Sequence, residues 1–320
     1  MPELPEVEAW RRQLDPLVKR SPIEQAGPAH IATLKTFDPP LKTLEGEGLR
    51  GVERRAKRFL LPTDDDELVL LVHLMSAGRL KYVPKNGKGA KAPIFRLRFV
   101  DGGELQLTEA GSKKRAGVWL LRPDAAREEL AHLGPEANEL EVEDVARILA
   151  SDSRRLHSLL RDQRLIAGIG RAWANEILWA ARLSPYALSS QLDDEEIERL
   201  QRAIRGEMDR GLELRLAGAN DEKTYRVHDK LGRACERCGT EIARVDFEEH
   251  TMSLRQPPRV QLKTAHLQGR TPCPLGTWLV RVVCPRCPRR GFLVGRHGAL
   301  DEEVRSRPAR VGVRARGVHD

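Results

Sequence analysis

The first eight residues, Met-Pro-Glu-Leu-Pro-Glu-Val-Glu, constrain the fold more than any other stretch, because they fix how the first helix begins. Pro5 suits the first turn of a helix, where the missing N–H of proline is no loss. The acidic residues around it complement the positive end of the helix dipole. Apolar residues then recur at helical spacing: Val7, Trp10, Leu14 and Leu17. We expect one amphipathic helix over residues 5–20, kinked or ended by Pro16.

The same stretch offers a reactive end. Removal of Met1 would leave Pro2 with a free secondary amine. An α-amino group titrates near pH ~7.7–8, so part of it is unprotonated at neutral pH. Such an amine attacks an aldehyde carbon and forms a Schiff base. Glu3 beside it and Glu6 one turn further would supply carboxylates for proton transfer. On these residues alone, an ordinary acidic first turn is the simpler interpretation.

Taken as a whole, the run over residues 2–8 resembles the N-terminus of the formamidopyrimidine-DNA glycosylase and endonuclease VIII family. Enzymes of that family excise oxidised bases from DNA. The resemblance implies that Pro2 is the nucleophile, that Glu3 is the general acid and base, and that Glu6 is a supporting carboxylate.

Composition agrees with a soluble nucleic-acid-binding protein. The 320 residues suit two domains and a small module. No run approaches the ~20 apolar residues of a membrane span, and the start does not read as a secretory signal. The net charge of +8 suits a polyanionic partner. Four of the five cysteines form two Cys-x-x-Cys pairs, which favours metal over disulfides. We expect a cytoplasmic protein, associated with the bacterial nucleoid if the resemblance holds.

Short strands are expected after the first helix. The clearest is Phe-Arg-Leu-Arg-Phe at 95–99, whose alternation gives one apolar and one basic face, followed by a hairpin turn at Asp101-Gly102-Gly103. The fold class is therefore α+β, with a helix and β-sandwich as the first domain, residues 1–130. The full set of expected strands is 29–34, 48–55, 59–62, 68–74, 94–100 and 105–108.

A basic run, Arg-Arg-Ala-Lys-Arg at 54–58, precedes one of these strands. It could be a solvated hairpin. The family carries a similar run, and the resemblance implies that Lys57 reaches the lesion site and contacts the DNA backbone, where an ammonium can bind phosphate or assist proton transfer.

Two loops depart from the family pattern. The family loop that fills the space of a flipped base often reads His-Leu-Gly-Met-Ser-Gly, whereas this chain has His-Leu-Met-Ser-Ala-Gly at 73–78. At the second loop, Ala116 stands where an aromatic wedge is usual, and an alanine cannot offset the cost of unstacking. Met75 and Arg115 are the remaining candidates for the vacated space. These departures bear on the choice of lesion and of opposite base.

Helices are expected at 143–150, 154–161, 173–181 and 193–213, after a linker at 122–136 with one short helix. They would form a second domain, residues 131–228. Gly168 and Gly170 precede a helix, which lets backbone amides approach a phosphate, although a plain helix–helix turn explains them equally. Residues 166–185 resemble the family's helix–two-turn–helix motif, with Arg171 and Trp173 replacing its asparagine and tyrosine and Glu176 matching it. The resemblance implies DNA binding here, with Arg171 able to hold a phosphate.

The two Cys-x-x-Cys pairs predict a structural zinc site formed by Cys235, Cys238, Cys284 and Cys287. The family has such a zinc ribbon, but there the pairs are about one hairpin apart, whereas segment 239–283 separates them here. Either the ribbon has a long insertion, or Cys273 replaces one ligand, or the chain beyond about Met252 leaves the family pattern. We expect a zinc-ribbon-like module at 229–290 and a flexible basic tail at 291–320.

The resemblance implies a bifunctional DNA glycosylase and abasic-site lyase that acts on damaged double-stranded DNA in base excision repair. We expect a monomer, because flipping one base needs only one copy of the chain. The proline Schiff base would be followed by β- and then δ-elimination. One alternative is a protein of the same fold that recognises lesions or abasic sites with little excision. A second alternative, a zinc-ribbon and helical module acting on RNA or in ribosome assembly, leaves the Pro2-Glu3 terminus unexplained.

Overall fold

The computed structural model describes residues 1–247, 250–255, 278–282 and 291–295. The chain divides into two compact units, Met1–Arg259 and Val260–Asp320. In the second unit the described residues form one antiparallel hairpin of β11 (Trp278–Val282) and β12 (Gly291–Gly295). β12 thus falls at the start of the predicted flexible tail, and the rest of that tail lies outside the described residues.

Helix α1 (Leu4–Val18) begins in a capping box. The backbone N–H of Glu3 donates to the side chain of Glu6 at 2.9 Å, and the Glu3 side chain caps the helix in return. The helix continues through Pro16 and ends at Val18. The predicted helix is confirmed, with its end two residues earlier than expected.

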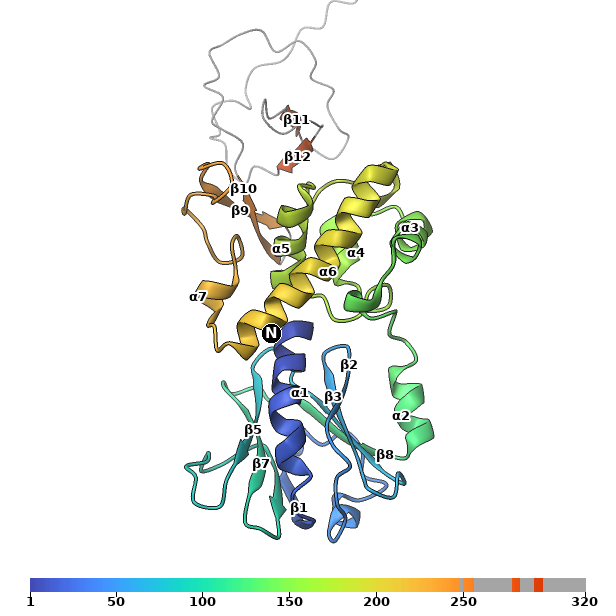
Figure 1. Cartoon of the computed structure of the whole chain (residues 1–320), viewed down its shortest axis with the longest axis vertical. Helices are drawn as coiled ribbons and strands as arrows, with labels where there is room; N and C mark the ends of the chain where they lie inside the picture. The colour runs from blue at the N-terminus through green and yellow to red at the C-terminus, as the bar shows by residue number, and fades with distance from the viewer. Residues whose placement is uncertain (248–249, 256–277, 283–290, 296–320) are drawn as a thin grey trace, which may run out of the picture. The chain divides into compact units, whose positions relative to one another are not determined.

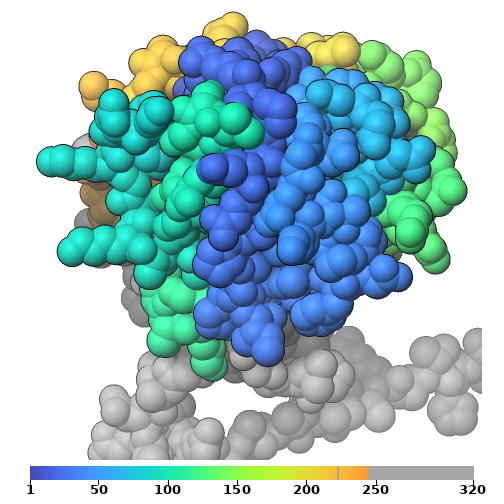
Figure 2. Space-filling model, turned by 90° about the horizontal axis from the view of Figure 1, so that it is seen from below, coloured from blue at the N-terminus to red at the C-terminus, as the bar shows by residue number. Residues whose placement is uncertain are grey.

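Two four-stranded antiparallel sheets follow, packed face to face around one apolar core. The predicted β-sandwich is therefore confirmed. Figure 2 shows the dark-blue N-terminal residues between the teal residues of one sheet and the lighter-blue residues of the other. The first sheet has the order β1 (Ile23–Ala29), β6 (Phe95–Phe99), β7 (Glu104–Glu109), β5 (Gly78–Val83), and the second has β2 (Glu53–Arg55), β3 (Arg58–Pro62), β4 (Val69–His73), β8 (Gly117–Leu121).

Most predicted strands are found, and the alternation in β6 buries its three apolar residues. The strand expected at 29–34 is wrong, because β1 ends at Ala29 and the amides of Thr33 and Leu34 turn back to the carbonyl of His30 at 2.8 and 3.1 Å. β1 itself was missed because it contains Gly27 and Pro28. A proline is tolerated there because β1 is an edge strand. β5 and β8 were also missed, and the strand expected at 48–55 is reduced to β2.

The second half is helical (Figure 1) and encloses its own apolar core. α1 joins both cores, since Leu4 packs in the helical core and Val7 in the sandwich core. The four predicted helices and the short linker helix are confirmed. The elements are α2 (Pro123–Leu130), α3 (Val142–Ser151), α4 (Leu156–Arg161), α5 (Arg171–Ala181), α6 (Asp194–Leu216), α7 (Asp221–Thr224) and the 3-10 helices η1 (Leu41–Leu44), η2 (Ala137–Glu139) and η3 (Ser189–Gln191), followed by a hairpin of β9 (Ile242–Phe247) and β10 (His250–Arg255).

Candidate active site

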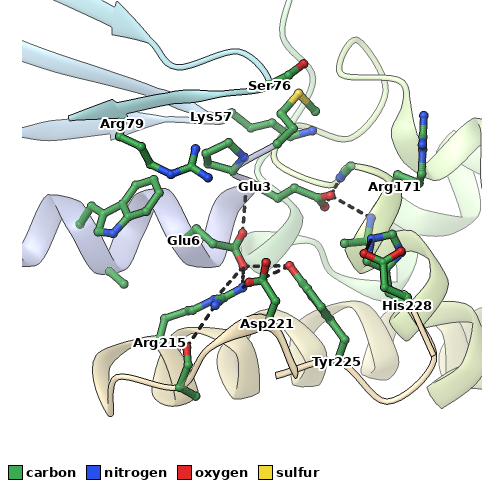
Figure 3. A pocket seen from close by; sticks show the side chains of 18 of the residues that line it. Glu3, Glu6, Lys57, Ser76, Arg79, Arg171, Arg215, Asp221, Tyr225 and His228 are labelled. Carbon is green, nitrogen blue, oxygen red and sulfur yellow. Dashed lines mark hydrogen bonds and ion pairs between the residues drawn. The ribbon is translucent and has the colours of Figure 1, made fainter. Parts of the chain in front are cut away.

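A cavity of about 840 Å³ opens at the N-terminal end of α1, between the sandwich and the helical half. Figure 3 shows Lys57, Ser76 and Arg79 reaching it from the sheet side, and Arg215, Asp221, Tyr225 and His228 from the other side. Glu3 and Glu6 lie between these two groups. Pro2 is buried in the cavity wall. Four residues predicted to be catalytic from sequence, Pro2, Glu3, Glu6 and Lys57, therefore line one cavity.

The carboxyl group of Glu3 is held at the first turn of α5. It accepts hydrogen bonds from the backbone amides of Gly170, of Ala172 at 2.9 Å and of Trp173 at 3.3 Å. Glycine is needed for this approach, because a Cβ atom at Gly170 would lie 2.5 Å from the Glu3 carboxyl. A Cβ atom at Gly168, whose φ is +102°, would lie 2.6 Å from Leu4. The glycine pair thus allows residues 3 and 4 to dock on α5, and its contact with DNA stays a prediction.

Burial shifts the pKa values of Glu3 and Lys57 away from their ordinary values. Burial raises the pKa of Glu3 above its ordinary value, although the charge of Lys57 opposes this effect. Burial also lowers the pKa of Lys57 to about 8, with Glu3 opposing and Arg161 reinforcing the shift. Lys57 Nζ donates to the carbonyl of Ile169 at 2.7 Å. An acid with a raised pKa beside an amine with a lowered one is an arrangement suited to proton transfer near neutral pH.

Glu6 is held by donors from three directions. Its carboxylate accepts from the backbone N–H of Glu3 at 2.9 Å, from Trp173 Nε1 at 3.2 Å and from Arg215 Nε at 3.1 Å. Tyr225 Oη lies 3.3 Å from the same carboxylate, and burial followed by the charge of Glu6 raises the pKa of the tyrosine well above its usual range. The tyrosine therefore stays a neutral donor, and the Glu6 side chain is held in place close to the reactive end.

The residues predicted to contact DNA are distributed more widely. Arg171, the first residue of α5, lines the cavity. Met75 and Arg115 do not line it. The β4–β8 ladder ends at the pair of His73 with Gly117. Met75 lies two residues after His73 and Arg115 two residues before Gly117, so both lie at the same end of this strand pair. Met75 is 36% exposed, whereas Ala116 is fully buried and its amide donates to Glu109 at 3.0 Å. Ala116 therefore cannot enter DNA.

Glu176 has a structural position that sequence did not indicate. Its carboxylate is fully buried and accepts the backbone amides of Arg226, Val227 and His228 at 2.9, 2.9 and 2.8 Å. It thereby anchors the segment that carries Tyr225 and His228 into the cavity. Several other cavity residues were also missed from sequence: Trp10, Arg79, Arg161, Arg215 and Tyr225.

Cys235 and Cys238 form a tight knuckle. Gly239 has φ +69° and donates its amide to the carbonyl of Cys235 at 2.7 Å, while Trp179 Nε1 donates to Cys235 Sγ at 3.4 Å. Cys273, Cys284 and Cys287 lie outside the described residues. Within the described ranges no group of three or more His, Cys, Asp or Glu side chains could hold a metal ion. That this knuckle forms half of a four-cysteine zinc site stays a prediction.

Comparison with known proteins points to one family. Residues 1–115 match the family model of the formamidopyrimidine-DNA glycosylase N-terminal domain, and residues 133–223 match that of the formamidopyrimidine-DNA glycosylase H2TH domain. The formamidopyrimidine-DNA glycosylases of Moorella thermoacetica and Pelotomaculum thermopropionicum are 32% and 33% identical to this chain. The alignments cover 77% and 76% of the chain and 94% of each relative.

Solved structures agree in fold. The Lactococcus lactis formamidopyrimidine-DNA glycosylase, bound non-covalently to DNA containing an AP site, has a TM-score of 0.72 at 24% identity, over 79% of this chain and 97% of that one. A MutM in complex with carbocyclic 8-oxo-G containing DNA has a TM-score of 0.72 at 25% identity, over 79% and 98%. Of the helices that the structure describes, none is both long and apolar enough to cross a membrane.

Proposed function

This chain belongs to the formamidopyrimidine-DNA glycosylase family, and from that premise we propose that it is a bifunctional DNA glycosylase and abasic-site lyase acting on damaged double-stranded DNA. The observation that carries the proposal is the docking of Glu3 on the first turn of α5, which places the Pro2-Glu3 end of the chain in the wall of a cavity with Lys57. A cavity of about 840 Å³ is large enough for one extruded nucleotide.

Pro2 is the nucleophile in this proposal. In the intact chain its nitrogen is part of the peptide bond to Met1, so the reaction requires that Met1 be removed. The secondary amine then attacks C1′ of the damaged nucleotide, the bond to the base breaks, and the base leaves with a proton. The product is a Schiff base between the sugar and Pro2.

Glu3 protonates the sugar ring oxygen as the ring opens. Its buried position, which raises its pKa, keeps a proton available for this step. The Glu6 carboxyl group, held by Trp173 and Arg215, lies beside the iminium that forms and stabilises its positive charge. Lys57 moves a proton or neutralises a phosphate as β- and then δ-elimination cleave the strand.

DNA contact is proposed for the cavity rim and for the sheet edge. Arg171 would hold a phosphate close to the extruded nucleotide, and the turn at Gly168 and Gly170 would lie along the same backbone. Met75 and Arg115, at one edge of the sandwich, would occupy the space left in the duplex. The L. lactis relative is bound to damaged DNA in its structure, which supports the same partner for this chain.

A structural zinc ion bound by Cys235, Cys238, Cys284 and Cys287 is proposed on the fit of the first pair. Its knuckle turns through Gly239 as thiolate sites require, and the indole N–H of Trp179 faces a sulfur that would carry negative charge. The ion would order the C-terminal module and take no part in bond breaking, because four cysteines leave no open position.

Borohydride trapping tests the function directly. The protein would be incubated with duplexes bearing an abasic site, 8-oxoguanine or an oxidised pyrimidine, alongside Pro2→Gly and a variant with one extra residue ahead of Pro2. We expect a covalent adduct with the unmodified protein that is lost when the N-terminus is extended. Tight binding without any adduct would favour the alternative of a recognition protein, which is also supported by the buried alanine at position 116, where the family usually has an aromatic wedge.

A further inference from the structure

The cavity extends from the reactive end along one face of α1. Glu6, Ala9, Trp10 and Gln13 all line it, and their spacing places them on a single stripe of the helix. Because an α-helix rises about 1.5 Å per residue, Trp10 lies roughly 6 Å along α1 from Glu6. The cavity therefore reaches from the Pro2-Glu3 end to Trp10 on α1.

An aromatic ring, a cation and two small residues line this part of the cavity. Trp10 is half-buried, packs against the sandwich core and carries the guanidinium of Arg79 at 5.9 Å from its ring centroid. Arg79 comes from β5 and points into the cavity (Figure 3). Gly218 and Ala219 also line the cavity, and a Cβ atom added at Gly218 would have no neighbour within 4 Å. The cavity is thus open at Gly218, and the partly exposed indole ring of Trp10 forms part of its wall.

Arg79 is available to a ligand. Among the described residues its side chain forms no ion pair; its guanidinium donates to the carbonyl of Gly78 at 2.8 Å and approaches the ring of Trp10. Arg215, by contrast, is occupied by Glu6 and Asp221. A guanidinium without an anion, beside an aromatic ring in the cavity wall, is suited to donate to carbonyl oxygens of a ring stacked there.

We propose that Trp10 is the stacking surface for the extruded base and that Arg79 donates to the carbonyl edge of that base. The inference rests on the proposed glycosylase function and adds the residues that select its substrate. A stacking surface favours a planar, fully conjugated base over one whose ring is saturated and puckered. The chain therefore selects planar oxidised bases that carry exocyclic carbonyl oxygens, and discriminates against ring-saturated pyrimidines.

The test compares substrates with and without a base. Single-turnover rates and KM would be measured for Trp10→Ala and Trp10→Phe on duplexes carrying 8-oxoguanine, dihydrothymine or an abasic site. We expect Trp10→Ala to lower kcat/KM on 8-oxoguanine at least tenfold and on the abasic duplex less than threefold. Trp10→Phe should restore most of the loss. Arg79→Leu should also lower kcat/KM more on the 8-oxoguanine duplex than on the abasic duplex, because an abasic site has no base carbonyl to accept a hydrogen bond from the guanidinium.

Trp119→Ala is the matched control. Trp119 is also a partly exposed tryptophan of the sandwich, on β8, but it does not line the cavity. An equal loss on the base-bearing and abasic duplexes in Trp10→Ala would mean that the tryptophan only supports α1, and an unchanged rate on 8-oxoguanine would exclude stacking. A wild-type protein that cleaves no duplex would instead overturn the proposed function, so the two failures are distinguishable.

Discussion

Gly170 and Glu3 approach each other so closely that a Cβ atom at position 170 would lie 2.5 Å from the Glu3 carboxyl carbon. The backbone at Gly170 has φ −125°, which alanine adopts readily. Gly170→Ala should therefore fold but displace the Glu3 side chain. Because a shift of about 1 Å in a reacting group can cost about 100-fold in rate, we expect single-turnover excision to fall by about that factor. Affinity for a duplex with a non-cleavable abasic analogue should change less than threefold.

Gly206→Ala provides the control for this glycine. Gly206 lies within α6, and an added Cβ would meet no atom within 4 Å. Replacing an interior helical glycine by alanine should stabilise the protein by up to about 1 kcal/mol and leave the rate unchanged. Wild-type excision by Gly170→Ala would show that the position of Glu3 does not depend on α5.

His73 predicts a specific loss of stability in acid. Burial, reinforced by the charges of Arg58 and Lys57, lowers the pKa of His73 to about 3 from an ordinary value of 6.5. Between these values the unfolded chain binds a proton that the folded protein does not, so stability falls as pH decreases through 6.5 toward 3. The slope from this one group approaches about 1.4 kcal/mol per pH unit. Urea unfolding of His73→Gln at pH 7, 6, 5 and 4 should show a shallower fall than wild type.

Exposed His30 is the matched control for the loss of a histidine. His30→Gln should keep the wild-type dependence on pH. If His73→Gln were as acid-sensitive as wild type, the acid lability would have to come from other groups, such as Glu8, whose pKa the hydrogen bonds of Arg11 and Arg12 hold at about 2.

Local patterns predicted the parts of this fold that local chemistry determines. The alternation in residues 95–99 is seen as the buried and exposed faces of β6, and the acidic stretch at Asp193 begins α6 as a capping box. Likewise, the N-terminal run brought Pro2, Glu3 and Glu6 to one cavity wall. In each case the residues that make the contact are neighbours in sequence.

Long-range contacts were not predictable in this way. Arg215 and Tyr225 reach Glu6 from more than 200 positions away, and no periodicity marks either residue. Trp10 has the spacing of a core residue, and only the structure shows that it also lines the cavity. Gly168 and Gly170 before α5 have the composition of a phosphate-binding turn, but the backbone amide of Gly170 donates a hydrogen bond to the Glu3 carboxyl group.

Arg161 should strengthen DNA binding without regard to the lesion. It is the last residue of α4, lines the cavity half-buried, and its guanidinium forms no hydrogen bond or ion pair with another described residue. Arg161 and Arg171 line the same cavity, and burial followed by the positive charge of Arg171 lowers the pKa of Arg161, so the two guanidinium groups repel each other. A phosphate would relieve this repulsion. Arg161→Leu should weaken binding to every duplex by about the same factor. It should also reduce the slope of log K for DNA binding against log salt concentration by about one.

Arg127→Leu is the corresponding control, because Arg127 is an exposed residue of α2 that does not line the cavity. The slope of log K for DNA binding against log salt concentration should be the same for Arg127→Leu as for wild type. A change in Arg161→Leu that depended on the lesion, with no change in slope, would assign Arg161 to the base instead of the phosphate.

Metal content and the fluorescence of Trp179 should change together. Trp179 donates to Cys235 Sγ at 3.4 Å and lies against the guanidinium of Arg237 at 3.9 Å, so loss of a zinc thiolate would alter its surroundings directly. A chelator should release one zinc ion per chain if the four-cysteine site is correct, and should shift the tryptophan emission. Trp179→Phe should lower metal affinity about tenfold or more, since it removes a hydrogen bond to a ligand.

Cysteine variants decide which sulfurs bind that ion. If Cys235, Cys238, Cys284 and Cys287 form the site, Cys235→Ser and Cys284→Ser should each abolish stoichiometric zinc, because a structural site rarely tolerates the loss of one of four ligands. Cys273→Ser should then keep one zinc per chain, measured by metal analysis of the purified protein. Zinc loss in Cys273→Ser with retention in Cys284→Ser would show that the long segment between the pairs supplies a ligand itself. Retention in Cys235→Ser would reject the knuckle as a metal site and leave its tight turn a purely structural feature.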